Sequence, residues 1–147
     1  MYPFADGSKR QRSAKVAPTL VTKFRLDDLL VHVPLPEGDF VWDTLKVDIQ
    51  GADVDALVSC GQYLKYFTCV VGEFDTQHYR VPKNVQTNPA DVLKSAGFVN
   101  TKLFGHSLWI NPRHKKAYLK DPESFGCHRV YDVKIDLDRL KSAFRNL

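Results

Sequence analysis

Apolar and polar residues alternate along residues 44–50, which is the period of a β-strand. One side of this strand carries the apolar side chains of Leu45, Val47 and Ile49. The alternation stops at Gly51, and the apolar positions of the following segment recur at the spacing of an α-helix. A strand that passes directly into a helix is typical of α/β proteins, in which ligands bind at the carboxyl ends of the strands.

A second strand and a second helix follow. Residues 67–74 include a run of β-branched or small apolar side chains, as expected of a central strand that is covered on both faces. Asn88 and Pro89 are typical of a helix N-cap and first helical position, and Gly97 is typical of a helix end. We therefore expect strands 44–50 and 67–74 to be adjacent and parallel, with a helical crossover between them.

An antiparallel hairpin is predicted beside this pair, formed by strands 98–105 and 107–112. Gly105 and His106 suit a two-residue turn between them. The fold class expected from these elements is α/β, with parallel strands plus an antiparallel hairpin.

The two ends of the chain are less regular. Residues 1–21 show no periodicity and are rich in Ser, Lys and Arg, which predicts a flexible basic arm before a domain at 22–147. Residues 25–30 predict a short helix, and residues 130–135 fit a strand or an extended segment. Asp136 is a candidate N-cap for a last helix with apolar residues at helical spacing.

Composition narrows the class of protein. With 147 residues the chain can bury the core of one domain. It has no apolar run of the ~20 residues that a membrane span needs and no signal-peptide pattern at its start. Cys60, Cys69 and Cys127 are an odd, widely spaced set, which we interpret as reduced thiols in the cytoplasm. No Cys-x-x-Cys spacing occurs, so no metal site is expected.

The net charge of +4 comes partly from two basic clusters. These are Lys9, Arg10, Arg12 and Lys15, and Arg113, Lys115, Lys116 and Lys120. Such clusters suit phosphate or nucleic-acid contact, but no RNA-recognition signature or set of stacking aromatics accompanies them. We interpret them as solvated surface and expect neither a nucleic-acid nor a membrane partner.

The amino-acid sequence of the first predicted strand and the segment after it is distinctive. Residues 45–57 read LKVDIQGADVDAL and resemble the LKIDVEGAE…VL segment of the FkbM-type family of S-adenosylmethionine-dependent methyltransferases. LDDLL at residues 26–30 stands upstream, as that family's LDDLL does. VVGEF at residues 70–74 follows where the family has a second strand ending in Glu. The resemblance extends over about residues 22–111 and is strongest before residue 74.

The resemblance implies the second half of a Rossmann-like methyltransferase sheet and the cofactor S-adenosylmethionine. It also implies transfer of a methyl group to a hydroxyl oxygen of a sugar or small metabolite. Such enzymes bind the cofactor with a Gly-rich loop after their first strand, and this chain has no Gly-x-Gly pattern. We therefore expect that the cofactor-binding half is missing and that the chain alone is not competent.

The resemblance also implies the site residues. Asp48 matches the family's strand-end Asp and would orient the acceptor or take its proton; alternatively it is a structural acid bonded to amides of the following turn. Glu73 would lie at the same rim as a second catalytic candidate, or serve as a capping or ion-paired acid. Gly51 matches the family and is the cofactor-binding candidate, although a backbone requirement is the preferred interpretation of this glycine. Gln50 replaces the family's Glu, which puts a charged role there in doubt.

A different class of function stays open beside the enzyme. A half sheet leaves one edge of strand 44–50 unpaired, and such an edge binds other strands. The chain would then be a non-catalytic interaction module derived from a methyltransferase fold. In either case we expect self-association through this edge.

Overall fold

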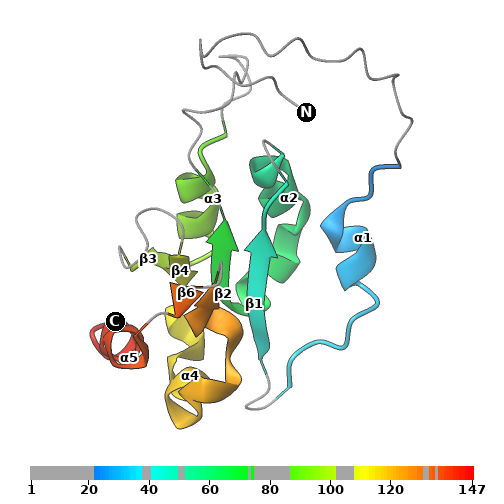
Figure 1. The fold of residues 1–147 in the computed structure, drawn as a ribbon. Helices are drawn as coiled ribbons and strands as arrows, with labels where there is room; N and C mark the ends of the chain where they lie inside the picture. The colour runs from blue at the N-terminus through cyan, green and yellow to red at the C-terminus, as the bar shows by residue number, and fades with distance from the viewer. Residues whose placement is uncertain are drawn as a thin grey trace, which may run out of the picture.

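A four-stranded mixed sheet forms the centre of this α/β fold (Figure 1). Its strands are β1 (Trp42–Val47), β2 (Phe67–Gly72), β3 (Val99–Asn100) and β4 (Leu108–Ile110), in the spatial order β1-β2-β4-β3. The structure is a computed structural model that describes residues 22–37, 41–49, 52–72, 74, 87–101, 108–130, 133–134 and 136–147.

The pairing of the strands confirms the predicted architecture. β1 runs parallel to β2, with Leu45 opposite Val70. β4 is antiparallel to β2 and to β3, so the predicted hairpin lies beside the parallel pair. The observed strands are shorter than predicted, and the proposed turn at Gly105 and His106 lies outside the described residues.

Helices and single turns connect these strands. The α-helices are α1 (Leu26–Leu30), α2 (Asp53–Ser59), α3 (Pro89–Ser95), α4 (Lys115–Lys120) and α5 (Leu137–Arg145). The 3₁₀ turns are η1 (Gly61–Tyr66), η3 (Pro112–His114), η4 (Pro122–Ser124) and η5 (Gly126–His128). Residues 130–135 were expected to form a strand or an extended segment. Their described residues belong to two short strands, β5 (Arg129–Val130) and β6 (Val133–Lys134), which pair in a separate two-stranded sheet.

Two of the helix starts were predicted from their caps. The Asn88 side chain accepts a hydrogen bond from the Ala90 amide at 2.9 Å, and Pro89 occupies the first turn of α3. Gly97 follows α3 with a φ of 92°, a conformation that favours glycine. The Asp136 side chain accepts from the Asp138 amide at 2.9 Å and so caps α5.

The sheet separates two hydrophobic cores, because successive residues of β2 point to opposite faces. Val70 packs in a first core with side chains of α2, η1 and α3, including Leu57, Leu64 and Leu93. Val71 packs in a second core with β4, α4 and α5, including Leu108, Ile110, Tyr118, Leu140 and Phe144. All six residues of β2 are buried, as expected of a central strand.

The structure corrects the interpretation of the cysteines. Cys69 of β2 and Cys127 of η5 form a disulfide across 58 residues of sequence, and only Cys60 is a free thiol among the described cysteines. Sequence spacing did not reveal this pair, because η4 and η5 return the chain to the sheet through a fold that no local pattern predicts. No helix in the described part of the chain is long and apolar enough to cross a membrane.

Candidate functional site

The carboxyl ends of β1 and β2 form a shared rim, since Val47 lies opposite Gly72 in the register. Asp48 follows β1 directly at this rim, with 35 % of its side chain exposed. Its carboxylate lies 3.7 Å from the ammonium of Lys46, which points to the same face of the sheet. Of the predicted site residues, Glu73 and Gly51 lie outside the described residues, as does Gln50, so the structure places Asp48 only.

A second acid, Asp53, has the structural role that was considered for Asp48. Asp53 is only 4 % exposed, and its Oδ1 accepts a hydrogen bond from the Ile49 amide at 3.1 Å. This bond connects the first turn of α2 back to the end of β1. This role was not predicted from the sequence, where the signal for it is an acid in the first helical turn after a strand.

On the β2 side of the rim, Gly72 lies in close contact with Val47 and Phe74. A Cβ atom at this position would lie 2.9 Å from the Val47 carbonyl oxygen and 2.5 Å from a ring carbon of Phe74. Only glycine therefore allows the two strand ends to approach as they do. This requirement was also missed, although the Gly within the VVGEF segment was a signal for it.

A pocket of about 540 Å³ adjoins the rim on the outer side of β1. It lies between the segment that leads into α1 and the first core's helix α2, and its size is that of a small-molecule cleft. Its walls are mostly apolar and include Phe24, Leu26, Ile49, Ala56 and Val58. The mouth carries an ion pair of Lys23 Nζ with the Asp55 carboxylate at 3.2 Å.

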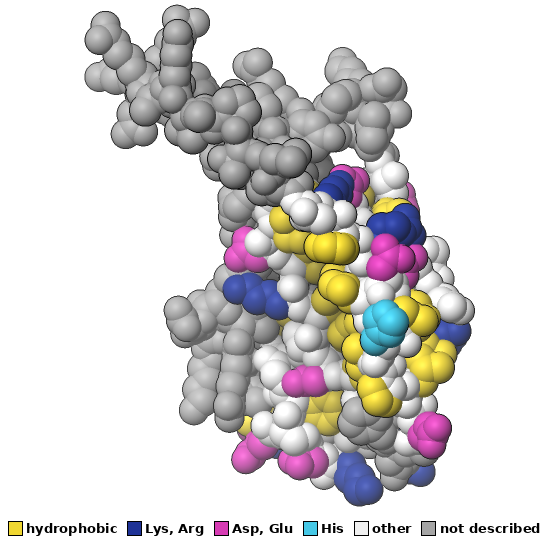
Figure 2. Space-filling model, turned by 90° about the vertical axis from the view of Figure 1, so that its right-hand side faces the viewer, with side chains coloured by type: hydrophobic (Ala, Val, Ile, Leu, Met, Phe, Trp, Pro, Cys, Tyr) yellow, Lys and Arg dark blue, Asp and Glu magenta, His cyan; other side chains and the backbone are white. Residues whose placement is uncertain are grey.

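Apolar side chains extend from this pocket along the face that carries α1, which Figure 2 presents. Ile49 is 53 % exposed, although the alternation placed it on the apolar side of the predicted strand, and Val58 of α2 is 48 % exposed. The exposed side chains continue along and beyond α1 with Leu29, Val31, Val33 and Leu35. β1 is also the edge of the described sheet, so the open edge and the apolar face are on the same side of the molecule.

His114 does not contribute to the rim. His114 Nε2 lies 3.0 Å from the Lys65 carbonyl oxygen, near the start of β2 and thus at the opposite end of the sheet. Burial lowers the pKa of His114, the hydrogen bond to the Lys65 carbonyl opposes this, and Arg113 lowers it further. Within the described ranges, no three His, Cys, Asp or Glu side chains are grouped so that they could hold a metal ion. His78 and His106 lie outside these ranges.

The candidate site thus consists of the β1–β2 rim with Asp48, together with the apolar pocket beside it. Comparison of the chain with protein-family models, with curated proteins and with solved structures finds no match.

Proposed function

We propose that this chain is the acceptor-side half of a Rossmann-like, FkbM-type S-adenosylmethionine-dependent methyltransferase that transfers a methyl group to a hydroxyl oxygen. The observation that carries the proposal is Asp48 at the end of β1 within a parallel β1–β2 pair. The order of strand, helix, strand, helix and antiparallel hairpin also agrees with what the sequence resemblance implies.

We assign Asp48 a role in binding the methyl acceptor. Its partly exposed carboxylate can accept a hydrogen bond from a hydroxyl group at the rim, which orients the oxygen and gives its proton a destination. The neighbouring Asp53 holds the turn through the Ile49 amide, so this structural contact does not depend on Asp48. The acceptor class is a sugar or another small hydroxylated metabolite.

We do not assign a cofactor site to the described residues of this chain. S-adenosylmethionine supplies the methyl group when bound, but the sequence has no Gly-x-Gly stretch to bring backbone amides against it. The pocket beside β1 is lined mainly by apolar side chains, with the Lys23–Asp55 pair at its mouth. We therefore assign cofactor binding to a second polypeptide segment that pairs with the open edge of β1 and covers the apolar face.

Complementation tests this function. The chain is mixed with the N-terminal half of an FkbM-type methyltransferase, cut before that protein's LDDLL segment, and methyl transfer from labelled S-adenosylmethionine to a panel of sugars is measured. Transfer is expected only from the mixture. Asp48→Asn should lower turnover by ~10²-fold with unchanged cofactor affinity.

The matched control is Asp28→Asn, which removes another exposed carboxylate, on α1 and away from the rim. It should leave turnover unchanged. A mixture that binds S-adenosylmethionine but transfers equally well with Asp48→Asn would remove Asp48 from the mechanism. A mixture that neither binds the cofactor nor forms a complex would contradict the proposed function.

The exposed edge and apolar face also favour a second candidate, a non-catalytic interaction module. In that case the two halves associate, and Asp48→Asn changes nothing because no methyl transfer occurs with any acceptor. Association without transfer would therefore distinguish the module from the enzyme half.

A further inference from the structure

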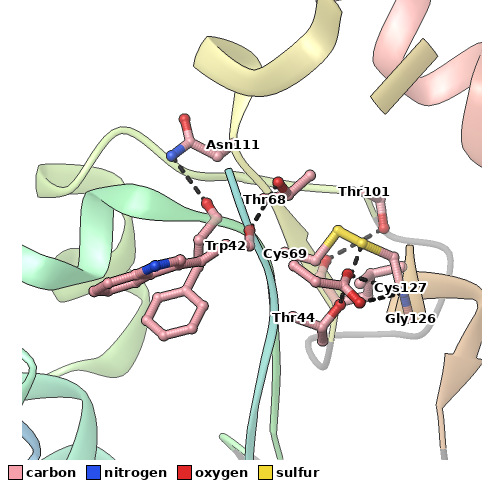
Figure 3. Close-up of a disulfide and its surroundings, with 11 residues drawn as sticks. Trp42, Thr44, Thr68, Cys69, Thr101, Asn111, Gly126 and Cys127 are labelled. Atoms are coloured by element: carbon pink, nitrogen blue, oxygen red, sulfur yellow. Dashed lines mark hydrogen bonds between the residues drawn. A yellow bond between two sulfur atoms is a disulfide. The ribbon is translucent and has the colours of Figure 1, made fainter. Parts of the chain in front are cut away.

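The disulfide joins the central strand to a surface turn. Cys69 lies on β2 and Cys127 on η5, and both residues are completely buried. Figure 3 shows the bond with Thr44 and Gly126 beside it, so that η5 meets β1 as well as β2 at this point. The bond does not contribute to the candidate site, and the inference drawn from it is independent of the proposed methyl transfer.

The turn carrying Cys127 belongs to the layer that covers the second core. We define this C-terminal layer as α4, η4, η5 and α5. Its side chains pack on the sheet through Tyr118 and Phe144, whose rings stack with centroids 4.0 Å apart. The main chain joins this layer to the sheet from β4 through η3 into α4, and the disulfide adds a covalent cross-link between η5 and β2.

Apart from the disulfide, polar contacts with β1 hold η5. The Asp43 carboxylate accepts hydrogen bonds from the Gly126 amide, at 2.8 and 2.7 Å to its two oxygens. Thr44 Oγ1 lies 3.5 Å from Cys127 Sγ. Asp43 is exposed, so water can compete for its carboxylate when the turn opens.

We propose that the Cys69–Cys127 pair is a redox latch that fixes the C-terminal layer to the sheet when oxidised and releases it when reduced. Reduction begins when the thiolate of an external thiol attacks one sulfur and forms a mixed disulfide. A second external thiol then resolves it, so that the chain gains two thiols and the two external thiols form one disulfide. The reverse exchange, with a low-molecular-weight disulfide as oxidant, closes the latch.

The third cysteine does not exchange with this bond in the folded chain. Cys60 lies in the first core, on the other face of the sheet from Cys69 and Cys127. Burial raises the pKa of its thiol to about 11, with a smaller contribution from Asp27, so little of it is the reactive thiolate. The latch therefore responds to thiols and disulfides outside the chain: it closes in an oxidising compartment and opens in the reduced cytoplasm.

Hydrogen exchange of the wild-type chain tests the latch, with and without tris(2-carboxyethyl)phosphine. Thiol titration in denaturant should give one free thiol in the oxidised chain and three in the reduced chain. Reduction should accelerate the exchange of amides in α4 and α5, and this acceleration should be at least about tenfold larger than that of amides in α2 and β2. If exchange accelerates equally in all these elements, the bond stabilises the whole domain and not the C-terminal layer alone, which would overturn the latch. Three thiols after treatment with oxidised glutathione would overturn it as well.

Asp43→Ala provides an independent arm, since it removes the acceptor that holds the Gly126 amide. Reduction of the disulfide by dithiothreitol should become about tenfold faster or more, because the turn opens more often once it has lost a hydrogen bond to a charged group. Asp28→Ala is the matched control, because Asp28 is an exposed acid on α1 and should leave the rate unchanged. Equal rates in wild-type protein and in Asp43→Ala would show that the turn does not limit access to the bond.

Discussion

Asn111, the residue after β4, offers a sharp test of how the sheet is held. It is 2 % exposed, and its Nδ2 donates hydrogen bonds to the carbonyl oxygens of Lys65 at 2.9 Å and Phe67 at 3.2 Å. Its Oδ1 accepts from the Arg113 amide at 3.2 Å and so caps η3. One side chain therefore connects the start of β2 to the turn that follows β4.

Asn111→Ala should lower the free energy of unfolding by about 2–4 kcal/mol. The change removes three hydrogen bonds, each worth about 1 kcal/mol, from a site that water does not reach. The Lys65 carbonyl keeps its contact with His114 Nε2 at 3.0 Å, which limits the loss. Asn111→Asp should cost more than Asn111→Ala, because a carboxylate oxygen would replace the donor that faces two carbonyl oxygens.

Asn88→Ala is the matched control. Asn88 also caps a helix through Oδ1 but is exposed, so its loss should cost about 1 kcal/mol. Unfolding in urea, followed by tryptophan fluorescence, gives the free energies, and an unchanged slope with urea shows that the unfolded states are comparable. If Asn111→Ala costs no more than Asn88→Ala, or Asn111→Asp is as stable as wild type, the buried amide bonds do not hold the sheet as described.

Four further outcomes are expected. Gly72→Ala should destabilise the fold by about 2–3 kcal/mol, measured by urea unfolding, because the added Cβ meets the Val47 carbonyl oxygen at 2.9 Å; a neutral change would contradict the close approach of the strand ends. Folding lowers the pKa of His114, so the unfolded chain takes up the proton first and stability falls as the pH drops below about 6.5. The melting temperature of His114→Gln should therefore fall less than that of the wild type between about pH 7.5 and pH 5.5. Equal decreases would refute the assignment of this pH dependence to His114. Val31→Lys should reduce self-association in light scattering without changing the melting temperature, because Val31 is 57 % exposed on the apolar face. A wild-type chain that stays monomeric at high concentration would contradict association through this face. Reduction of the disulfide, which closes a loop of 58 residues, should cost about 4 kcal/mol of stability in the same urea assay, and an unchanged midpoint would contradict this.

The parts of the fold that sequence predicted are those set by local chemistry. The period of two along β1, the change to helical spacing in α2 and the caps at Asn88 and Asp136 all depend on neighbours in the sequence. The disulfide and the Asn111 contacts were not predictable in this way. They join residues that are 58 and 44 to 46 positions apart, and such contacts exist only once the tertiary fold has brought the segments together.

The exposure of Ile49 shows the same limit within a single strand. Alternation placed Leu45, Val47 and Ile49 on one face, and the structure agrees for the first two, which pack in or against the first core. Ile49 has the same position in the pattern but lies beyond the end of β1, where it lines the pocket instead. Periodicity determines which way a side chain points, whereas burial depends on what covers that face.

The candidate site depends on a similar distinction between Asp48 and Asp53. Both acids belong to the strand–turn–helix segment that carries the family resemblance, and the sequence alone left Asp48 with either a chemical or a structural role. The direction of the turn gives the structural contact to Asp53: α2 aims its carboxylate back at the Ile49 amide and buries it, while Asp48 lies partly exposed at the strand end beside Lys46. An acid whose carboxylate is bonded to a backbone amide is poorly placed to serve a substrate, so the proposed acceptor contact is assigned to Asp48 and not to Asp53. The complementation assay with Asp48→Asn therefore tests the proposed role of this partly exposed carboxylate.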